Sequence, residues 1–303
     1  MDAQTEFLGV FSDMPAAEYF AAAGVNNSIL KGMAKSPAHC FALHLAPDRP
    51  KRQPTTSMFS GTLAHCAQIE PDAMAARYIV TPEDAPRRPT AAQWNAKKSS
   101  PDSVSAMAWW SVFNASAEGL QIVTAEQYAT TRAQLAAIQL SPEIAALFAT
   151  GHGEQSAFWR DSATGLICKC RPDWVHDLPD GRVILVDLKT AADDSPTGFA
   201  RTVAAMGYHR QAAWYTAGWQ AATGRDVAGF IFAAVGSAYP FMATPYALDD
   251  ETMAQGAEEC AELLEQFAAC RRSNNWPGYG VGVQLIGLPG WARRNIEVEV
   301  AYV

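Results

Sequence analysis

The fold is decided by three short stretches: Glu154-Gln-Ser-Ala-Phe158, Arg171-Pro-Asp173 and Val186-Asp187-Leu-Lys189-Thr190. Asp187 ends an apolar run of strand-forming residues, and an acid at the end of a buried strand is costly unless another group pairs with it. Lys189 lies two positions further on, so it projects from the same face of that strand. Glu154 and Asp173 belong to neighbouring strands, and two hairpins bring them to the same end of a sheet.

Carboxylates gathered beside a lysine are typical of a Mg²⁺ site with a group that orients or deprotonates a water molecule. The carboxylates supply hard oxygen ligands, and the lysine stabilises hydroxide or the charge that develops on phosphorus. For an isolated Asp-x-Lys, a buried ion pair that supports the sheet would be the better interpretation. The additional presence of Asp173 and Glu154 favours the metal site.

The surrounding sequence predicts a single α/β domain over residues 1–303, with a mostly helical part over 1–150 and a catalytic part over 151–303. Apolar periodicity and turn residues mark the elements. Helices are expected over 27–35, 57–70, 102–117, 124–140 and 196–222, and a further acidic helix over 249–265. Strands are expected over 155–160, 166–176, 183–188 and 227–235.

Two motifs resemble those of a known nuclease superfamily. Pro172-Asp173 followed by Asp187-Leu188-Lys189 resembles the PD-(D/E)XK signature, and Gln211-Ala-Ala-Trp-Tyr215 resembles the Q-x-x-x-Y motif of the branch with RecB nuclease domains, lambda-type exonuclease and Cas4. The chain is also similar to the exodeoxyribonuclease VIII (RecE) C-terminal nuclease family. That likeness adds Asn27-Ser-Ile-Leu-Lys31, Gly61-Thr-Leu-Ala-His65, Glu70-Pro71, Thr164-Gly165, Gly207-Tyr208 and Trp276-Pro-Gly-Tyr279.

The resemblance implies a PD-(D/E)XK nuclease core, which is a mixed β-sheet flanked by helices, with a helical N-terminal elaboration. It also implies residue roles. Lys189 would position or activate the attacking water. The implied metal ligands are Asp173, Asp187, the main-chain carbonyl of Leu188, Glu154 and His65. The alternative for His65 is a core histidine whose hydrogen bonds are satisfied.

A row of side chains on the helix after the catalytic strand is a candidate DNA contact. Tyr208, Gln211 and Tyr215 stand at i, i+3 and i+7, so they share one face of that helix. Such a row suits phosphate contacts and base stacking, and Gln211 also counts among the catalytic candidates. Arg171 is a further expected phosphate contact. The alternative is that both tyrosines are packing residues.

The resemblance implies a Mg²⁺-dependent exodeoxyribonuclease, with Mn²⁺ as a substitute. It would degrade linear double-stranded DNA from 5′ to 3′ and leave 3′ single-stranded overhangs for a single-strand annealing protein in phage-type recombination. Relatives assemble into rings, so a homo-oligomeric ring is expected. Two alternatives stay open: a DNA endonuclease or repair nuclease of the same fold, and a catalytically silent DNA-binding clamp.

Net charge does not exclude DNA as the substrate. The chain has 31 acidic and 23 basic residues, a formal charge of −8. Seven acids and no base lie between Asp249 and Glu265, whereas ten bases and five acids lie between Lys31 and Lys98. We therefore expect salt-sensitive, Mg²⁺-assisted DNA binding with the acidic helix turned away from the duplex.

The sequence does not favour an iron–sulfur cluster, ATP binding, or a membrane or secreted location. Only Cys260 and Cys270 follow the Q-x-x-x-Y segment, without a C-x-x-C pair, so no iron–sulfur cluster is expected. No Walker A motif is present, so no ATP is expected. The chain lacks an apolar run of membrane-spanning length and a signal peptide at Met1, which predicts a cytoplasmic protein with reduced cysteines and no membrane partner.

Overall fold

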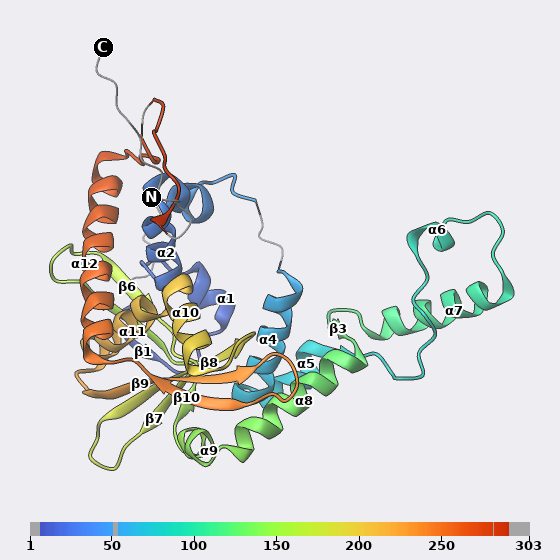
Figure 1. Ribbon diagram of the computed structural model, residues 1–303. Coiled ribbons are helices and arrows are strands. Elements are labelled where there is room, and N and C mark those ends of the chain that lie inside the picture. Colours follow the sequence, from blue (N-terminus) through green and yellow to red (C-terminus); the bar gives the residue numbers. More distant parts are fainter. Residues whose placement is uncertain (1–6, 51–53, 281, 291–303) are drawn as a thin grey trace.

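Two β-sheets organise the computed structural model, which describes residues 7–50, 54–280 and 282–290 (Figure 1). The larger sheet has the order β10-β9-β8-β7-β4, in which β8 and β9 are parallel and the other pairs are antiparallel. Its strands are β4 (His152–Gly153), β7 (Trp174–Asp177), β8 (Val183–Ala191), β9 (Val227–Gly236) and β10 (Ala243–Ala247). The expected mixed sheet flanked by helices is confirmed.

The smaller sheet is antiparallel, with the order β1-β5-β6. Its strands are β1 (Gly9–Phe11), β5 (Ser156–Arg160) and β6 (Ile167–Cys170). The prediction of one strand over 166–176 was wrong, because β6 ends at Cys170 and β7 begins at Trp174 in the other sheet. Pro172 lies in the link, and its lack of an N–H group prevents it from continuing a hydrogen-bonded ladder.

Three helices cover one face of the larger sheet: α10 (Pro196–Met206), α11 (Tyr208–Thr223) and α12 (Asp250–Ser273). The single helix expected over 196–222 is thus two helices. They separate at Gly207, whose left-handed φ of +69° suits glycine. A Cβ at this position would also lie 2.2 Å from Nη2 of Arg210.

The main core lies where α11 packs between the two sheets and α12. Trp159 from β5, Leu185 from β8 and Phe232 from β9 are buried there. Trp214 of α11 and Leu264 of α12 complete the contact between layers. Burial of this apolar surface supplies the main stabilisation of the fold, and it holds β8 and α11 in fixed register.

Most of the N-terminal half is helical, as expected. Its helices are α1 (Ala16–Ala21), α2 (Asn27–Lys35), α3 (Pro37–Cys40), α4 (Thr56–Ile69), α5 (Met74–Arg77), α8 (Ala125–Leu140) and α9 (Pro142–Ala149), with a π-helical turn at Phe41–Leu45 and a 3-10 turn at Pro71–Ala73. Helix α2 starts at Asn27, as expected, and the side chain of Asn26 caps it by accepting from the Ile29 N–H. None of the helices in the described residues is both long and apolar enough to cross a membrane.

Residues 81–120 project from the body of the molecule as an arm (Figure 1). The chain leaves through β2 (Tyr78–Val80) and returns through β3 (Gln121–Val123), which pair in parallel. The arm itself carries α6 (Ala91–Trp94) and α7 (Pro101–Ser116). Its base packs on α4 through a small apolar cluster that includes Leu63, Tyr78 and Val123.

Besides its apolar contacts, the acidic helix α12 is joined to α11 by the carboxylate of Glu259. Glu259 Oε2 lies 3.0 Å from Nε2 of His209 and 2.5 Å from Nη1 of Arg210, and its Oε1 accepts from Gln255 at 2.7 Å. Burial alone would raise the pKa of Glu259, but these hydrogen bonds outweigh it and lower the pKa to about 2. The carboxylate is therefore charged in the folded protein.

Replacing Glu259 with Gln is expected to lower the free energy of unfolding by about 1–3 kcal/mol at neutral pH, because charge-assisted hydrogen bonds are lost. The folded-state pKa is depressed, so this contribution is complete above about pH 4.5 and is lost as the pH falls toward 2. Urea unfolding near pH 7 and near pH 3 measures it. The exposed neighbour offers a control, since Glu258→Gln should cost little. An equal loss at both pH values would contradict the assignment.

Candidate functional site

Asp187 is the central residue of β8 and Lys189 lies two positions further on, because the strand expected to end at Leu188 continues to Ala191. Asp187 is only 1% exposed. Lys189 Nζ forms an ion pair with Asp187 Oδ2. On the other side, Gln211 Nε2 of α11 donates a 2.5 Å hydrogen bond to Asp187 Oδ1. Both oxygens of this buried carboxylate are therefore held by polar groups, as a buried charge requires.

Asp173 lies in the link between β6 and β7, immediately before β7 begins. Its Oδ2 accepts a 2.8 Å hydrogen bond from the Leu188 N–H, so it lies beside the strand that carries Asp187. Its Oδ1 lies 3.1 Å from Nε2 of His65, a residue of α4. Leu188, whose carbonyl is an expected ligand, therefore lies on β8 between Asp187 and Lys189 and next to Asp173.

Glu154 lies in the link between β4 and β5, with its Oε1 3.3 Å from Nε2 of His65. Its backbone is left-handed, with a φ of +55°, which is unusual for a residue with a side chain. The Glu154 N–H donates to the carbonyl of Asp173 at 3.0 Å, which ties the two links together. Backbone strain of this kind is typical of functional sites.

Arg171 is bound to neighbouring groups of the protein. Its guanidinium pairs with Glu154 and donates to Ser156 Oγ at 2.5 Å and to the Met14 carbonyl at 2.9 Å. The side chain is only 11% exposed. These contacts of Arg171 orient Glu154, and the expected contact of Arg171 with DNA phosphate stays a prediction.

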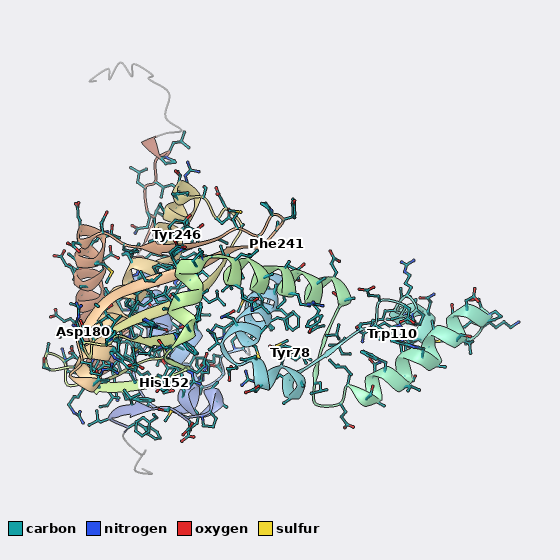
Figure 2. The ribbon with its side chains drawn as sticks, turned by 90° about the horizontal axis from the view of Figure 1, so that it is seen from below. Tyr78, Trp110, His152, Asp180, Phe241 and Tyr246 are labelled. Carbon is teal, nitrogen blue, oxygen red and sulfur yellow. The ribbon has the colours of Figure 1, made fainter. Side chains whose placement is uncertain are left out.

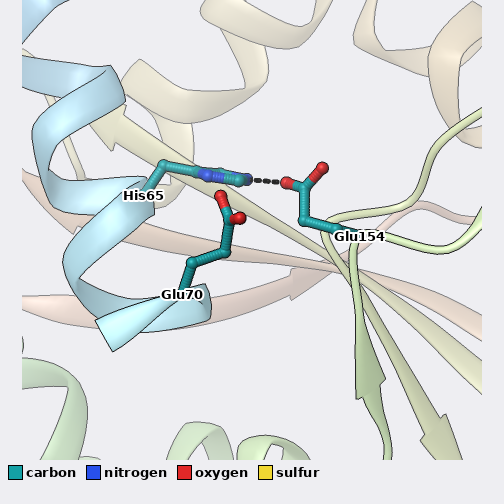
Figure 3. A group of neighbouring side chains, drawn as sticks. All are labelled: His65, Glu70 and Glu154. Atoms are coloured by element: carbon teal, nitrogen blue, oxygen red, sulfur yellow. Dashed lines mark ion pairs between the residues drawn. The ribbon is translucent and has the colours of Figure 1, made fainter. Parts of the chain in front are cut away.

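Glu70 is a member of the site that the sequence prediction did not include. One ligand atom from each of His65, Glu70 and Glu154 lies within 4.8 Å of the others (Figure 3). Glu70 follows the last turn of α4, and Arg77 holds both of its oxygens at 2.6 and 2.7 Å. Its only signal in the sequence was its place in the His65-x(4)-Glu70-Pro71 motif.

The ionisable groups of the site shift one another's pKa values. Burial lowers the pKa of His65, but the carboxylates of Asp173 and Glu154 outweigh it and raise the pKa to about 9. Burial raises the pKa of Asp187 to about 6, with the charge of Asp173 acting in the same direction and Lys189 opposing it. The crowded carboxylates thus compete for positive charge, which is the electrostatic environment of a cation site.

The two tyrosines of the expected DNA row lie in different surroundings. Tyr208 begins α11 beside the site: Lys189 Nζ lies 4.8 Å from its ring centroid, and its ring stacks on Phe232. Tyr215 packs against the core, with Phe230 at a centroid distance of 6.2 Å. Tyr215 thus has packing contacts, as in the alternative interpretation, and the expected DNA contacts of both tyrosines stay predictions.

These donors fit a divalent cation. His65 joins two of the acids, since its Nε2 lies 3.1 Å from Asp173 Oδ1 and 3.3 Å from Glu154 Oε1. Asp187 precedes the Leu188 N–H that binds Asp173, and the charge of Asp173 adds to the rise in pKa that burial causes at Asp187. Carboxylate oxygens of this kind suit Mg²⁺ or Mn²⁺, whose positive charge would lower that pKa.

Comparison with known proteins agrees with this geometry. The family described as "PDDEXK-like domain of unknown function" (DUF3799) matches residues 26–287, and the chain belongs to it. A crystal structure from Eubacterium rectale, described as a "putative exonuclease", is similar in fold with a TM-score of 0.53. It is 12% identical in sequence, and the alignment covers 87% of this chain and 88% of that one. Among curated proteins, no match is found.

Adding Mg²⁺ or Mn²⁺ to the metal-free protein is expected to raise the Tm by about 4 °C at roughly 100 times the Kd, because binding to the folded state alone stabilises it. Differential scanning fluorimetry measures the shift. Asp173→Asn should remove most of it. Asp180→Asn should keep it, since Asp180 is an exposed acid paired with Arg182 in the β7–β8 turn. Equal shifts in both variants would place the cation elsewhere.

Gln211→Glu is expected to lower the free energy of unfolding by about 3 kcal/mol in EDTA at neutral pH, because it buries a second carboxylate against Asp187. The same substitution at Gln220, an exposed position of α11, should cost less than about 0.5 kcal/mol. Chemical unfolding of the two variants compares these costs. If they are equal, Gln211 does not hold Asp187.

Proposed function

We propose that the chain is a divalent-cation-dependent nuclease that hydrolyses DNA from the ends of linear duplexes. The observation that carries this proposal is the ion pair of Asp187 with Lys189, set beside Asp173, Glu154 and His65. The PDDEXK-like family supports a nuclease. The exonuclease description of the similar structure favours action at DNA ends.

In this proposal, each residue of the site has a separate role in phosphodiester hydrolysis. Burial lowers the pKa of Lys189, but Asp187 and Asp173 outweigh it and raise the pKa, so the amine stays protonated. An ammonium group cannot accept a proton; it donates hydrogen bonds to the attacking water or to a phosphate oxygen and stabilises negative charge there. Asp187 positions this ammonium and Gln211 positions Asp187. A divalent cation held by the carboxylates, His65 and the Leu188 carbonyl would supply Lewis-acid activation of the phosphate.

The finer features of the proposal come from the RecE-type resemblance. They are Mg²⁺ as the cation, degradation from 5′ to 3′, 3′ overhangs passed to a single-strand annealing protein, and a homo-oligomeric ring. Residues 1–303 act as one nuclease domain in this proposal. The closeness of the Tyr208 ring to Lys189 Nζ, at 4.8 Å, supports Tyr208 as the proposed substrate contact near the scissile phosphate.

Linear duplex labelled at its 5′ ends is expected to release acid-soluble label with Mg²⁺, while closed circular duplex stays intact. Release from 3′-labelled ends alone would reverse the polarity. Cleavage of circles would instead support an endonuclease of the same fold.

Asp187→Asn is expected to reduce the rate by about 10³-fold or more, because the cation loses a charged ligand and Lys189 loses its partner. DNA binding, measured by fluorescence anisotropy in EDTA, should change little. Asp180→Asn is the matched control and should keep the wild-type rate. Normal activity of Asp187→Asn, with its fold verified by circular dichroism, would refute the site.

A further inference from the structure

The projecting arm presents an ordered loop, residues 85–100, on the helix α7. Trp110 of α7 is 5% exposed and contacts this loop twice. Its Nε1 donates a 2.8 Å hydrogen bond to the Pro86 carbonyl, and the Arg88 guanidinium lies 4.8 Å from the centroid of its ring. Thr90 and Gln93 form a capping box that starts α6 within the loop. Figure 2 shows Trp110 in the arm, well separated from Tyr78 at its base. The loop is therefore held in place by α7.

This loop has a charge opposite to that of the whole chain. Residues 85–100 contain four bases and no acid, although the chain carries a net charge of −8. The bases are Arg87, Arg88, Lys97 and Lys98, and all four are exposed. Arg88 lies over the Trp110 ring, and Arg87, Lys97 and Lys98 are the other exposed bases of the loop.

An exposed aromatic residue lies close to these bases in the sequence. Trp94 ends α6 and is 42% exposed, three and four residues before the two lysines. A large apolar ring left in solvent next to cationic side chains is a recurring arrangement in proteins that bind single-stranded nucleic acid, because the bases stack while the lysines contact phosphates. A duplex offers no free base face to such a ring except at its ends.

We infer that the arm is a second DNA contact, which binds single-stranded DNA through Arg87, Lys97 and Lys98 and stacks a base on Trp94. This inference rests on the proposed nuclease function, since digestion of one strand leaves the other single-stranded. The arm is connected to the candidate site, because its base packs on α4, the helix that carries His65. The acidic helix α12 lies on the opposite side of the molecule from the arm (Figure 1).

Binding of the full chain to a labelled single-stranded oligonucleotide in EDTA, followed by fluorescence anisotropy over a salt series, tests the inference without cleavage. Lys97→Gln/Lys98→Gln should weaken binding about ten-fold and reduce the slope of log K against log salt by about 1.4, which is two phosphate contacts. Trp94→Ala should weaken it about five-fold or more. The matched control, Arg271→Gln/Arg272→Gln, removes two exposed charges at the end of α12 and should change affinity less than about two-fold.

Unchanged affinity and slope in the arm variants would overturn the inference, and so would an equal loss in the α12 control. A loss confined to blunt duplex, without an effect of Trp94→Ala, would also overturn it. If the arm variants change the native mass of the protein but not its DNA affinity, the arm is a protein contact instead. Absence of cleavage by the wild-type protein with Mg²⁺ tests the proposed function separately, because the binding experiment needs no catalysis.

Discussion

The burial of one carboxylate, that of Asp187, is the constraint on which the rest of the site depends. A carboxylate that is only 1% exposed needs partners that stabilise its charge. For Asp187 these are the ammonium group of Lys189 and the side-chain amide of Gln211. The amide reaches Asp187 from the first turn of α11, which begins directly after Gly207. The same start of α11 brings Tyr208 against Lys189. The break between α10 and α11 is therefore part of the site and not an interruption of a helix.

The other two acids share a topological position. Glu154 lies where the chain passes from the larger sheet to the smaller one, and Asp173 lies where it passes back. Neither residue belongs to a strand, so the alternation of side chains along a strand does not fix the direction of either side chain. The hydrogen bond from the Glu154 N–H to the Asp173 carbonyl fixes the two crossings to each other. Convergence on His65 thus results from the way that two sheets are joined.

The sequence predicted the parts of this arrangement that depend on local pattern. The placement of Asp187 and Lys189 on one strand face follows from strand periodicity, and the ranges expected for α2 and α12 agree with the structure at the start of each helix. The passage between sheets at Pro172 was missed, because apolar residues continue on both sides of it. Arg171 pairs with Glu154 and Tyr215 packs on Phe230, and both contacts depend on the tertiary fold. Sequence spacing alone could not distinguish these roles from DNA contacts.

The pairing of β2 with β3 has a consequence for how such proteins can diversify. The backbone hydrogen bonds between these short strands close the arm at its base, and Tyr78 and Val123 bury their side chains against α4. An insertion whose two ends already meet can lengthen, shorten or change its charge without displacing the helix beneath it. The length and charge of the arm can therefore change while α4, which carries His65, keeps its place.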